Sequence, residues 1–131
     1  MSTLAVGTIK SVSSAAPVFQ NTSGTEKGQL VKVWIKMNGT GTIAINDSFG
    51  VSSIADNGTG FYTINFSTAF ASTNYCPVTA LASYLLADSD RRYPLHIDQV
   101  ETGLCKVLQA EVANNSSAND GNFICVAIFG D

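Results

Sequence analysis

The chain has 131 residues, a formal net charge of −3 and a sequence pI of about 4.9. This length suits one domain with one ordinary core, and 45% hydrophobic residues exclude a disordered chain. The Lys and Arg residues are scattered without a basic stripe, so nucleic-acid binding is not expected. Only 13% of the residues are charged. Because so few charges are available to cover the surface of a monomer, we expect an oligomer. The alternative is a monomer whose surface consists of its many Ser, Thr, Asn and Gly residues.

We interpret the first 28 residues as an N-terminal arm or an irregular entry strand, and we predict a β-sandwich domain over residues 29–131. The segment 11–28 is rich in Ser, Thr and Gly. The first residues have no basic segment followed by an apolar run, so neither a signal peptide nor a membrane anchor is expected.

Hydrophobic residues then alternate with polar ones, which is typical of β-strands. From residue 30 to 37, Val33, Ile35 and Met37 share one face, and Lys32 and Trp34 lie on the other. An Asn-Gly turn follows at residues 38–39, and a short strand is expected at 42–46. Residues 49–50 mark another break before the next strand.

The clearest hairpin covers residues 51–66. A strand at 51–55 leads into a loop at 56–60 that contains Asn57 and two glycines, residues that accept positive φ angles. The returning strand at 61–66 places Tyr62, Ile64 and Phe66 on one face. The same Asn-Gly-Thr-Gly sequence occurs at 38–41 and 57–60, which predicts two similar turns rather than duplicated modules.

Four further strands are expected at 78–84, 95–100, 104–112 and 123–129, with polar loops at 85–92 and 113–121. The last strand is apolar on both faces, which is typical of a strand inside a sandwich or beneath a partner subunit. The candidate subunit-interface residues are Trp34, Phe123, Ile124, Val126, Ile128 and Phe129.

About seven to nine short strands separated by turns predict an all-β fold, an antiparallel, jelly-roll-like β-sandwich. No helical periodicity longer than a turn is present. The three cysteines, Cys76, Cys105 and Cys125, lie in apolar contexts and match no metal motif. We expect them to be buried free thiols.

No catalytic site, metal site or cofactor is expected. The single histidine, His96, lies two residues from Asp98, but no nucleophile motif accompanies this pair. The carboxylates lie mostly in turns, where they cap the backbone. The segment Asp88-Ser89-Asp90 resembles part of a calcium loop but lacks the downstream Gly and Glu.

Binding residues are expected in loops and among aromatic side chains. Trp34, Tyr75, Tyr84 and Tyr93 could stack on sugar rings, or could be core or interface residues. The candidate surface-recognition residues are Asp88, Asp90, Arg91, Arg92, Tyr93, Asn114, Asn115 and Asn119.

Four segments resemble a domain that recurs in bacteriophage tail-fibre-like proteins. They are VWIKMNGTGT at 33–42, FGVSSIADNGTGFYTINF at 49–66, ICVAIF at 124–129 and GTE at 24–26, and the region 84–119 diverges. The resemblance implies a non-catalytic, trimeric module exposed on the virion, often of a tail fibre.

The module begins near residue 7, whereas a typical fibre has a long shaft before it. We therefore expect either a short fibre or receptor-binding tip, or a capsid decoration protein that stabilises the head shell. The expected partners are other copies of the chain, tail or capsid proteins, and a host cell-surface glycan or protein, with no membrane insertion. An enzyme acting on host polysaccharide is a third hypothesis, and it depends on His96 or an Asp pair.

Overall fold

The structure is a computed structural model that describes residues 6–10, 19–28, 30–81, 94–110 and 118–130. The chain divides into two units, residues 1–30 and 31–131, and each is described by itself. Every regular element in the described ranges is a β-strand.

The first unit contains a small antiparallel hairpin made of β1 (Phe19–Gln20) and β2 (Glu26–Gly28). Asn21 closes its turn, because the side-chain oxygen accepts hydrogen bonds from the backbone N–H groups of Ser23 (3.1 Å) and Thr25 (2.8 Å). This is the local bonding that makes Asn a frequent turn residue.

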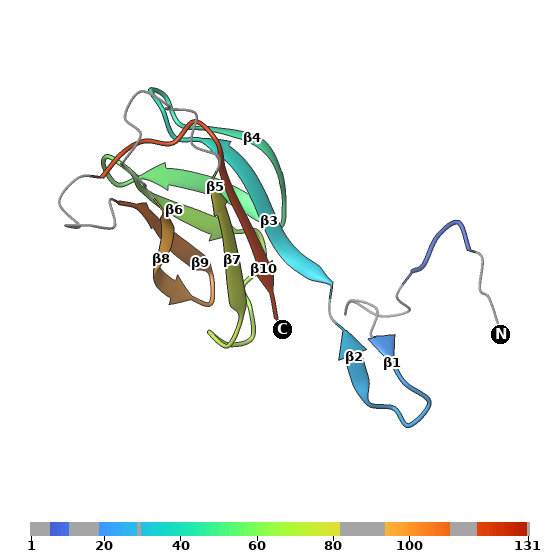
Figure 1. Cartoon of the computed structure of the whole chain (residues 1–131). Helices are drawn as coiled ribbons and strands as arrows, with labels where there is room; N and C mark the ends of the chain where they lie inside the picture. Colours follow the sequence, from blue (N-terminus) through green and yellow to red (C-terminus); the bar gives the residue numbers. More distant parts are fainter. Residues whose placement is uncertain (1–5, 11–18, 29, 82–93, 111–117, 131) are drawn as a thin grey trace. The chain divides into compact units, whose positions relative to one another are not determined.

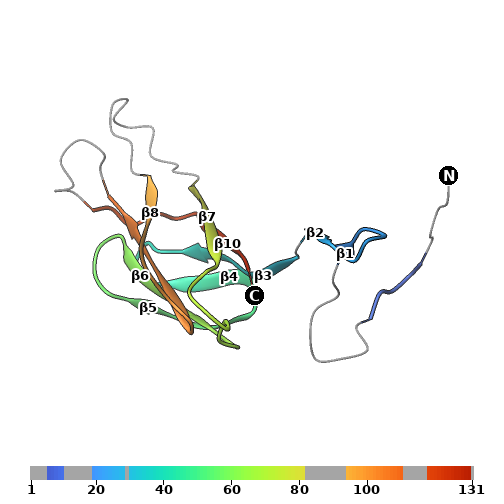
Figure 2. The same ribbon diagram turned by 90° about the horizontal axis from the view of Figure 1, so that it is seen from below.

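The second unit is a sandwich of two four-stranded antiparallel sheets (Figures 1 and 2). The first sheet has the order β4-β3-β10-β7, and the second has the order β5-β6-β9-β8. The strands of the first sheet are β3 (Val31–Asn38), β4 (Ala44–Phe49), β7 (Cys76–Leu81) and β10 (Ile124–Phe129); those of the second are β5 (Val51–Asp56), β6 (Phe61–Phe66), β8 (Leu95–Glu101) and β9 (Leu104–Gln109). The predicted β-sandwich is confirmed, and the finer expectation of a jelly roll stays a prediction.

The predicted hairpin at 51–66 is confirmed as β5 and β6, with Ile54 opposite Ile64. The strand expected at 42–46 was placed too early, because β4 runs from Ala44 to Phe49. Its polar residues Asp47 and Ser48 interrupted the apolar pattern, and an edge strand accepts such residues. The strand expected at 78–84 begins at Cys76, and its last three residues lie outside the described ranges.

Gly50 carries the chain from the first sheet to the second. It separates β4 from β5 and has a φ angle of 72°. A Cβ atom there would lie 2.8 Å from the carbonyl oxygen of Lys32, so a side chain would meet backbone. Only glycine combines this positive φ angle with this close approach.

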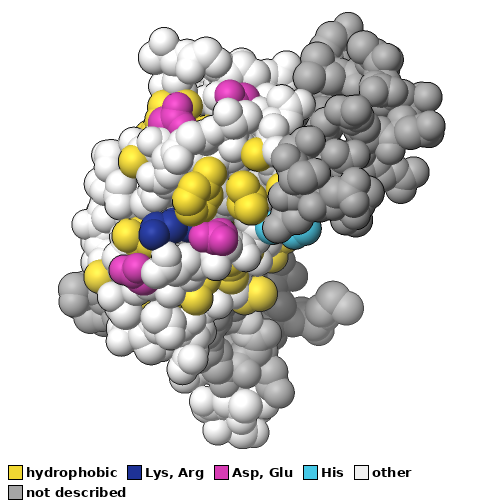
Figure 3. Space-filling view, turned by 90° about the vertical axis from the view of Figure 1, so that its left-hand side faces the viewer, with side chains coloured by type: hydrophobic (Ala, Val, Ile, Leu, Met, Phe, Trp, Pro, Cys, Tyr) yellow, Lys and Arg dark blue, Asp and Glu magenta, His cyan; other side chains and the backbone are white. Residues whose placement is uncertain are grey.

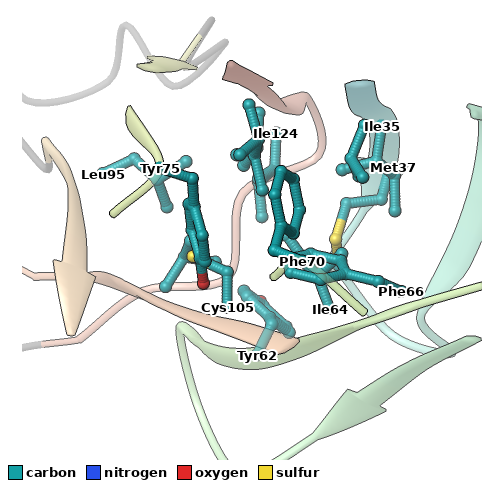
Figure 4. Packing of buried hydrophobic residues seen from close by; sticks show 14 residues of the cluster. Ile35, Met37, Tyr62, Ile64, Phe66, Phe70, Tyr75, Leu95, Cys105 and Ile124 are labelled. Atoms are coloured by element: carbon teal, nitrogen blue, oxygen red, sulfur yellow. The ribbon is translucent and has the colours of Figure 1, made fainter. Parts of the chain in front are cut away.

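The core lies between the two sheets and is filled by alternate residues of the facing strands. Figure 4 shows side chains from both sheets, among them Ile35, Met37 and Ile64, pointing into the same space. Three aromatic rings close one end: the centroid of Phe66 lies 5.2 Å from that of Phe70 and 5.9 Å from that of Tyr75. These rings anchor the segment that connects β6 to β7 across the sandwich.

The structure corrects the predicted subunit interface at three positions. Ile124, Val126 and Ile128 were expected at an interface, but each is at most 3% exposed within the single chain. They alternate along β10 toward the core, and the intervening residues Cys125 and Ala127 point away from it. An apolar run alone did not distinguish the two faces of this strand.

Candidate functional site

Most of the predicted recognition residues lie outside the described ranges: Asp88, Asp90, Arg91, Arg92, Tyr93, Asn114 and Asn115. Of the predicted set, Asn119 is described. It is half-buried, and its backbone N–H donates to the carbonyl oxygen of Gln109 at 3.2 Å. Asn119 therefore helps to hold the chain beside β9.

The predicted His96–Asp98 pair lies on β8, and both side chains are exposed. The register between β8 and β9 shifts between Ile97 and Gln99, which makes Asp98 the extra residue of an irregularity. The expected alternation, with both side chains on one face, is therefore interrupted. Among the described residues, no three His, Cys, Asp or Glu side chains gather closely enough to hold a metal ion.

Figure 3 shows the surface around the histidine, where hydrophobic side chains form small groups among polar and charged atoms. The pairing of the strands shows which apolar and polar side chains are neighbours on this surface. Across the outer face of the second sheet, Phe61 and His96 lie on either side of Leu108, and Gln99 lies opposite Lys106. This outer face carries both polar and apolar side chains.

The outer face of the first sheet is more apolar. One row across it places Phe49, Trp34, Ala127 and Val78 side by side on four successive strands. Four apolar side chains on this face stay exposed to water: Phe49 by 58%, Val78 by 52%, Phe129 by 38% and Phe123 by 36%. We call this surface the apolar face; it consists of Trp34, Phe49, Val78, Ala80, Phe123, Cys125, Ala127 and Phe129.

A groove of about 280 Å³ runs along the middle of the apolar face. Residues of β3, including Trp34, form one wall, and residues of β7, including Val78, form the other. Cys125 and Ala127 on β10 leave the floor low, because they are small. The groove exists because small residues on the central strand lie between larger ones.

Two lysines of β3 lie against aromatic rings. The ammonium nitrogen of Lys36 lies 4.7 Å from the centroid of the Phe123 ring, and that of Lys32 lies 5.0 Å from the Phe70 ring. Both distances are within the range of cation–π attraction. Burial raises the pKa of the Cys125 thiol, and the charge of Lys36 partly offsets this effect.

The three cysteines differ in exposure, contrary to the expectation that all are buried. Cys105 is buried in the core, where burial raises its pKa to about 11. Cys125 is half-buried, and Cys76 is exposed. The prediction was wrong for Cys76, because this residue begins an edge strand and alternates away from the core. All three are free thiols.

Of the sugar-stacking candidates, Tyr75 is a core residue. It is 7% exposed, and its hydroxyl lies 3.0 Å from the carbonyl oxygen of Glu101 and 2.8 Å from that of Leu104. Burial raises its pKa to about 12. Trp34 lies on the apolar face, and Tyr84 and Tyr93 lie outside the described ranges.

A partly buried polar network, which the sequence did not indicate, joins three loops at the end of the sandwich opposite the aromatic rings. The Tyr62 hydroxyl donates to Oδ1 of Asp120 at 2.7 Å and lies 3.3 Å from the carbonyl oxygen of Gly39. The same Asp120 oxygen accepts from the backbone N–H of Gly60 at 2.6 Å. Burial and the neighbouring Asp120 carboxylate raise the pKa of Tyr62.

The repeated Asn-Gly-Thr-Gly turns meet at this network. A Cβ atom on Gly39 would collide with the Tyr62 hydroxyl, and one on Gly60 would lie 2.6 Å from the carbonyl oxygen of Gln109. Gln109 is 1% exposed, and its Oε1 has no hydrogen-bond partner among the described residues. The repeated sequence was the one available signal for this network, and it did not reveal the role of Asp120.

Comparison with known proteins finds no matching family model, no similar curated protein and no similar solved structure. The described ranges contain no helix, and hence none that is long and apolar enough to cross a membrane.

Proposed function

We propose that the protein is a non-enzymatic structural module of a bacteriophage particle, a short tail-fibre or receptor-binding unit that attaches the particle to a host surface. In this proposal it acts as an oligomer of identical chains within the virion, and the homotrimer that the resemblance implies stays an expectation. Its partners are other copies of the chain, neighbouring tail proteins and a glycan or protein on the host cell.

The apolar face is the observation that carries this proposal. The largest apolar patch on the surface of a soluble protein is often a binding surface. Here Phe49 and Val78 are more than half exposed on a four-stranded sheet. A subunit of a larger assembly accounts for such a face, because its neighbours cover it.

The resemblance to tail-fibre-like domains supplies the second support. Its most specific segment, residues 49–66, forms the Gly50 crossing and the β5–β6 hairpin. The Gly50 crossing is one of the connections between the two sheets, and the hairpin forms half of the second sheet. The resemblance therefore involves the residues that build the fold and not one surface loop.

Labelling of virions tests the proposal. Phage particles carrying an epitope tag on this chain are purified, imaged with gold-conjugated antibody, and digested for quantitative mass spectrometry. Label at the tail tip, at a few multiples of three or six copies, is the expected result. Hundreds of copies over the head would contradict the tail role and indicate capsid decoration instead. Purified virions that lack the protein would refute both roles.

Host attachment is tested separately with purified protein and host cells. Binding that saturates, and that competes with phage adsorption, is expected from a receptor-binding unit. Tail label together with an absence of detectable cell binding would reduce the role to a structural tail component.

A further inference from the structure

We propose that the apolar face is a self-association surface, covered in the assembled protein by the same face of a second copy of this chain. The inference rests on the proposed function, because it names the partner that the virion module contacts first. It concerns the outer face of the β4-β3-β10-β7 sheet and leaves the outer face of the other sheet free for other contacts.

The distribution of the exposed residues favours a protein over a small molecule. A ligand that fills the groove of about 280 Å³ would contact Trp34, Val78 and Ala127. It would leave Phe49, which is 58% exposed and lies beyond the Trp34 wall, in water. A partner that extends across all four strands covers both the groove and the residues around it.

The area of the face matches what a stable dimer needs. A large aromatic side chain buries about 150–250 Å² when it is fully covered. The exposed parts of Phe49, Val78, Phe129 and Phe123 therefore correspond to roughly 400 Å² per copy. A standard interface buries about 800 Å² per partner, and somewhat more than half of this area is apolar. The apolar face supplies most of that apolar share without any contribution from the loops.

The sizes of the side chains make the face complementary to itself. In the row across the sheet, the large residues Phe49 and Trp34 lie on β4 and β3, and the smaller Ala127 and Val78 lie on β10 and β7. The next row carries the longer, charged Asp47 and Lys36 on β4 and β3, followed by the small Cys125 and Ala80 on β10 and β7. A two-fold rotation about an axis parallel to the strands lays the large half of each copy over the groove of the other. Such an isologous contact buries the same residues on both copies.

The experiment measures self-association of the purified full-length chain by sedimentation over a wide concentration range. The wild-type protein is expected to associate. The variant Phe49→Thr/Val78→Thr is expected to dissociate with a Kd raised at least roughly tenfold, because it removes the two most exposed of the large apolar side chains on this face. Threonine retains strand propensity, and urea unfolding verifies that the variant is folded. The matched control is Phe61→Thr on the other sheet, which should leave association unchanged.

Alkylation of Cys125 provides a second, independent measurement. Cys125 lies on the groove floor, so brief alkylation followed by mass spectrometry should show less modification at concentrations where the chain associates. A wild-type chain that stays monomeric, a double variant that associates as tightly as wild type, or unchanged Cys125 labelling would each overturn the inference. A chain that associates through this face but is absent from virions would refute the proposed function alone.

Discussion

Removing the Tyr62 hydroxyl is the sharpest test of the polar network. The substitution Tyr62→Phe keeps the ring, which is fully buried in the core, and deletes the atom that donates to Asp120 at 2.7 Å. The Asp120 carboxylate then keeps only the Gly60 N–H among the hydrogen bonds described for it. The loops lose the two contacts that the Tyr62 hydroxyl makes, to Asp120 and to the carbonyl oxygen of Gly39, and the packing of the two sheets is expected to stay unchanged.

The expected cost follows from the type of bond. A hydrogen bond to a charged group contributes about 1.5–3 kcal/mol to stability. Asp120 is only half-buried, so water can replace part of the lost contact. We therefore expect the free energy of unfolding to fall by about 1–2 kcal/mol. For a domain of this size each kcal/mol corresponds to roughly 4–8 °C in Tm.

Urea unfolding followed by circular dichroism measures this loss, with the m value unchanged if only the native state is affected. Tyr75→Phe is the matched control, because its hydroxyl bonds neutral backbone carbonyl groups and should cost less, about 1 kcal/mol. The double-mutant cycle of Tyr62→Phe with Asp120→Asn should show a coupling above about 0.5 kcal/mol. A Tyr62→Phe variant as stable as wild type, or strictly additive substitutions, would refute the network.

Three further predictions concern the turns, the thiols and alkaline pH. Gly60→Ala should destabilise the fold by several kcal/mol more than Gly41→Ala in urea unfolding. Both residues have a positive φ angle, but only at Gly60 would the new Cβ meet backbone. In native protein near pH 8, a thiol reagent should modify Cys76 rapidly and Cys105 only after unfolding, because burial raises the Cys105 pKa to about 11; early labelling of Cys105 would contradict the core packing. The folded-state pKa of Tyr75, raised to about 12, lies above the ordinary value of 10, so the unfolded chain loses this proton first and stability falls between about pH 10 and 12. Urea midpoints measured across this range should fall less steeply in Tyr75→Phe than in wild type.

Strict alternation predicted the parts of the fold in which one face of a strand is buried. The hairpin at 51–66 and the strand beginning near residue 30 were placed within about a residue, because Ile35 and Ile64 alternate with polar neighbours. A one-residue slip would expose the whole buried set, so such strands have a well-defined register. The edge strand β4 was misplaced because Asp47 and Ser48 interrupt this pattern without breaking the strand.

The candidate site was less predictable, because it depends on pairing between distant strands. Trp34 was singled out from the sequence, but Phe49 and Val78 became its neighbours only through the strand order β4-β3-β10-β7. Asp120 lies in a polar loop that resembles any solvated loop. Its contact with Tyr62, 58 positions earlier, requires the assembled sandwich. Local patterns carry no information about such long-range contacts.

The two faces of β10 connect the fold to the proposed assembly. A two-layer sandwich covers only the inner face of each sheet, so a strand that is apolar on both faces lacks one cover. The second sheet covers Ile124, Val126 and Ile128, but Cys125 and Ala127 form the floor of an open groove. On the other sheet, the outward residues of β8 and β9 include His96, Gln99 and Lys106, which water solvates well. Because the large apolar side chains of Phe49, Val78 and Phe129 are exposed on the first of these faces, self-association should depend on substitutions in the β4-β3-β10-β7 sheet and tolerate those on the opposite sheet.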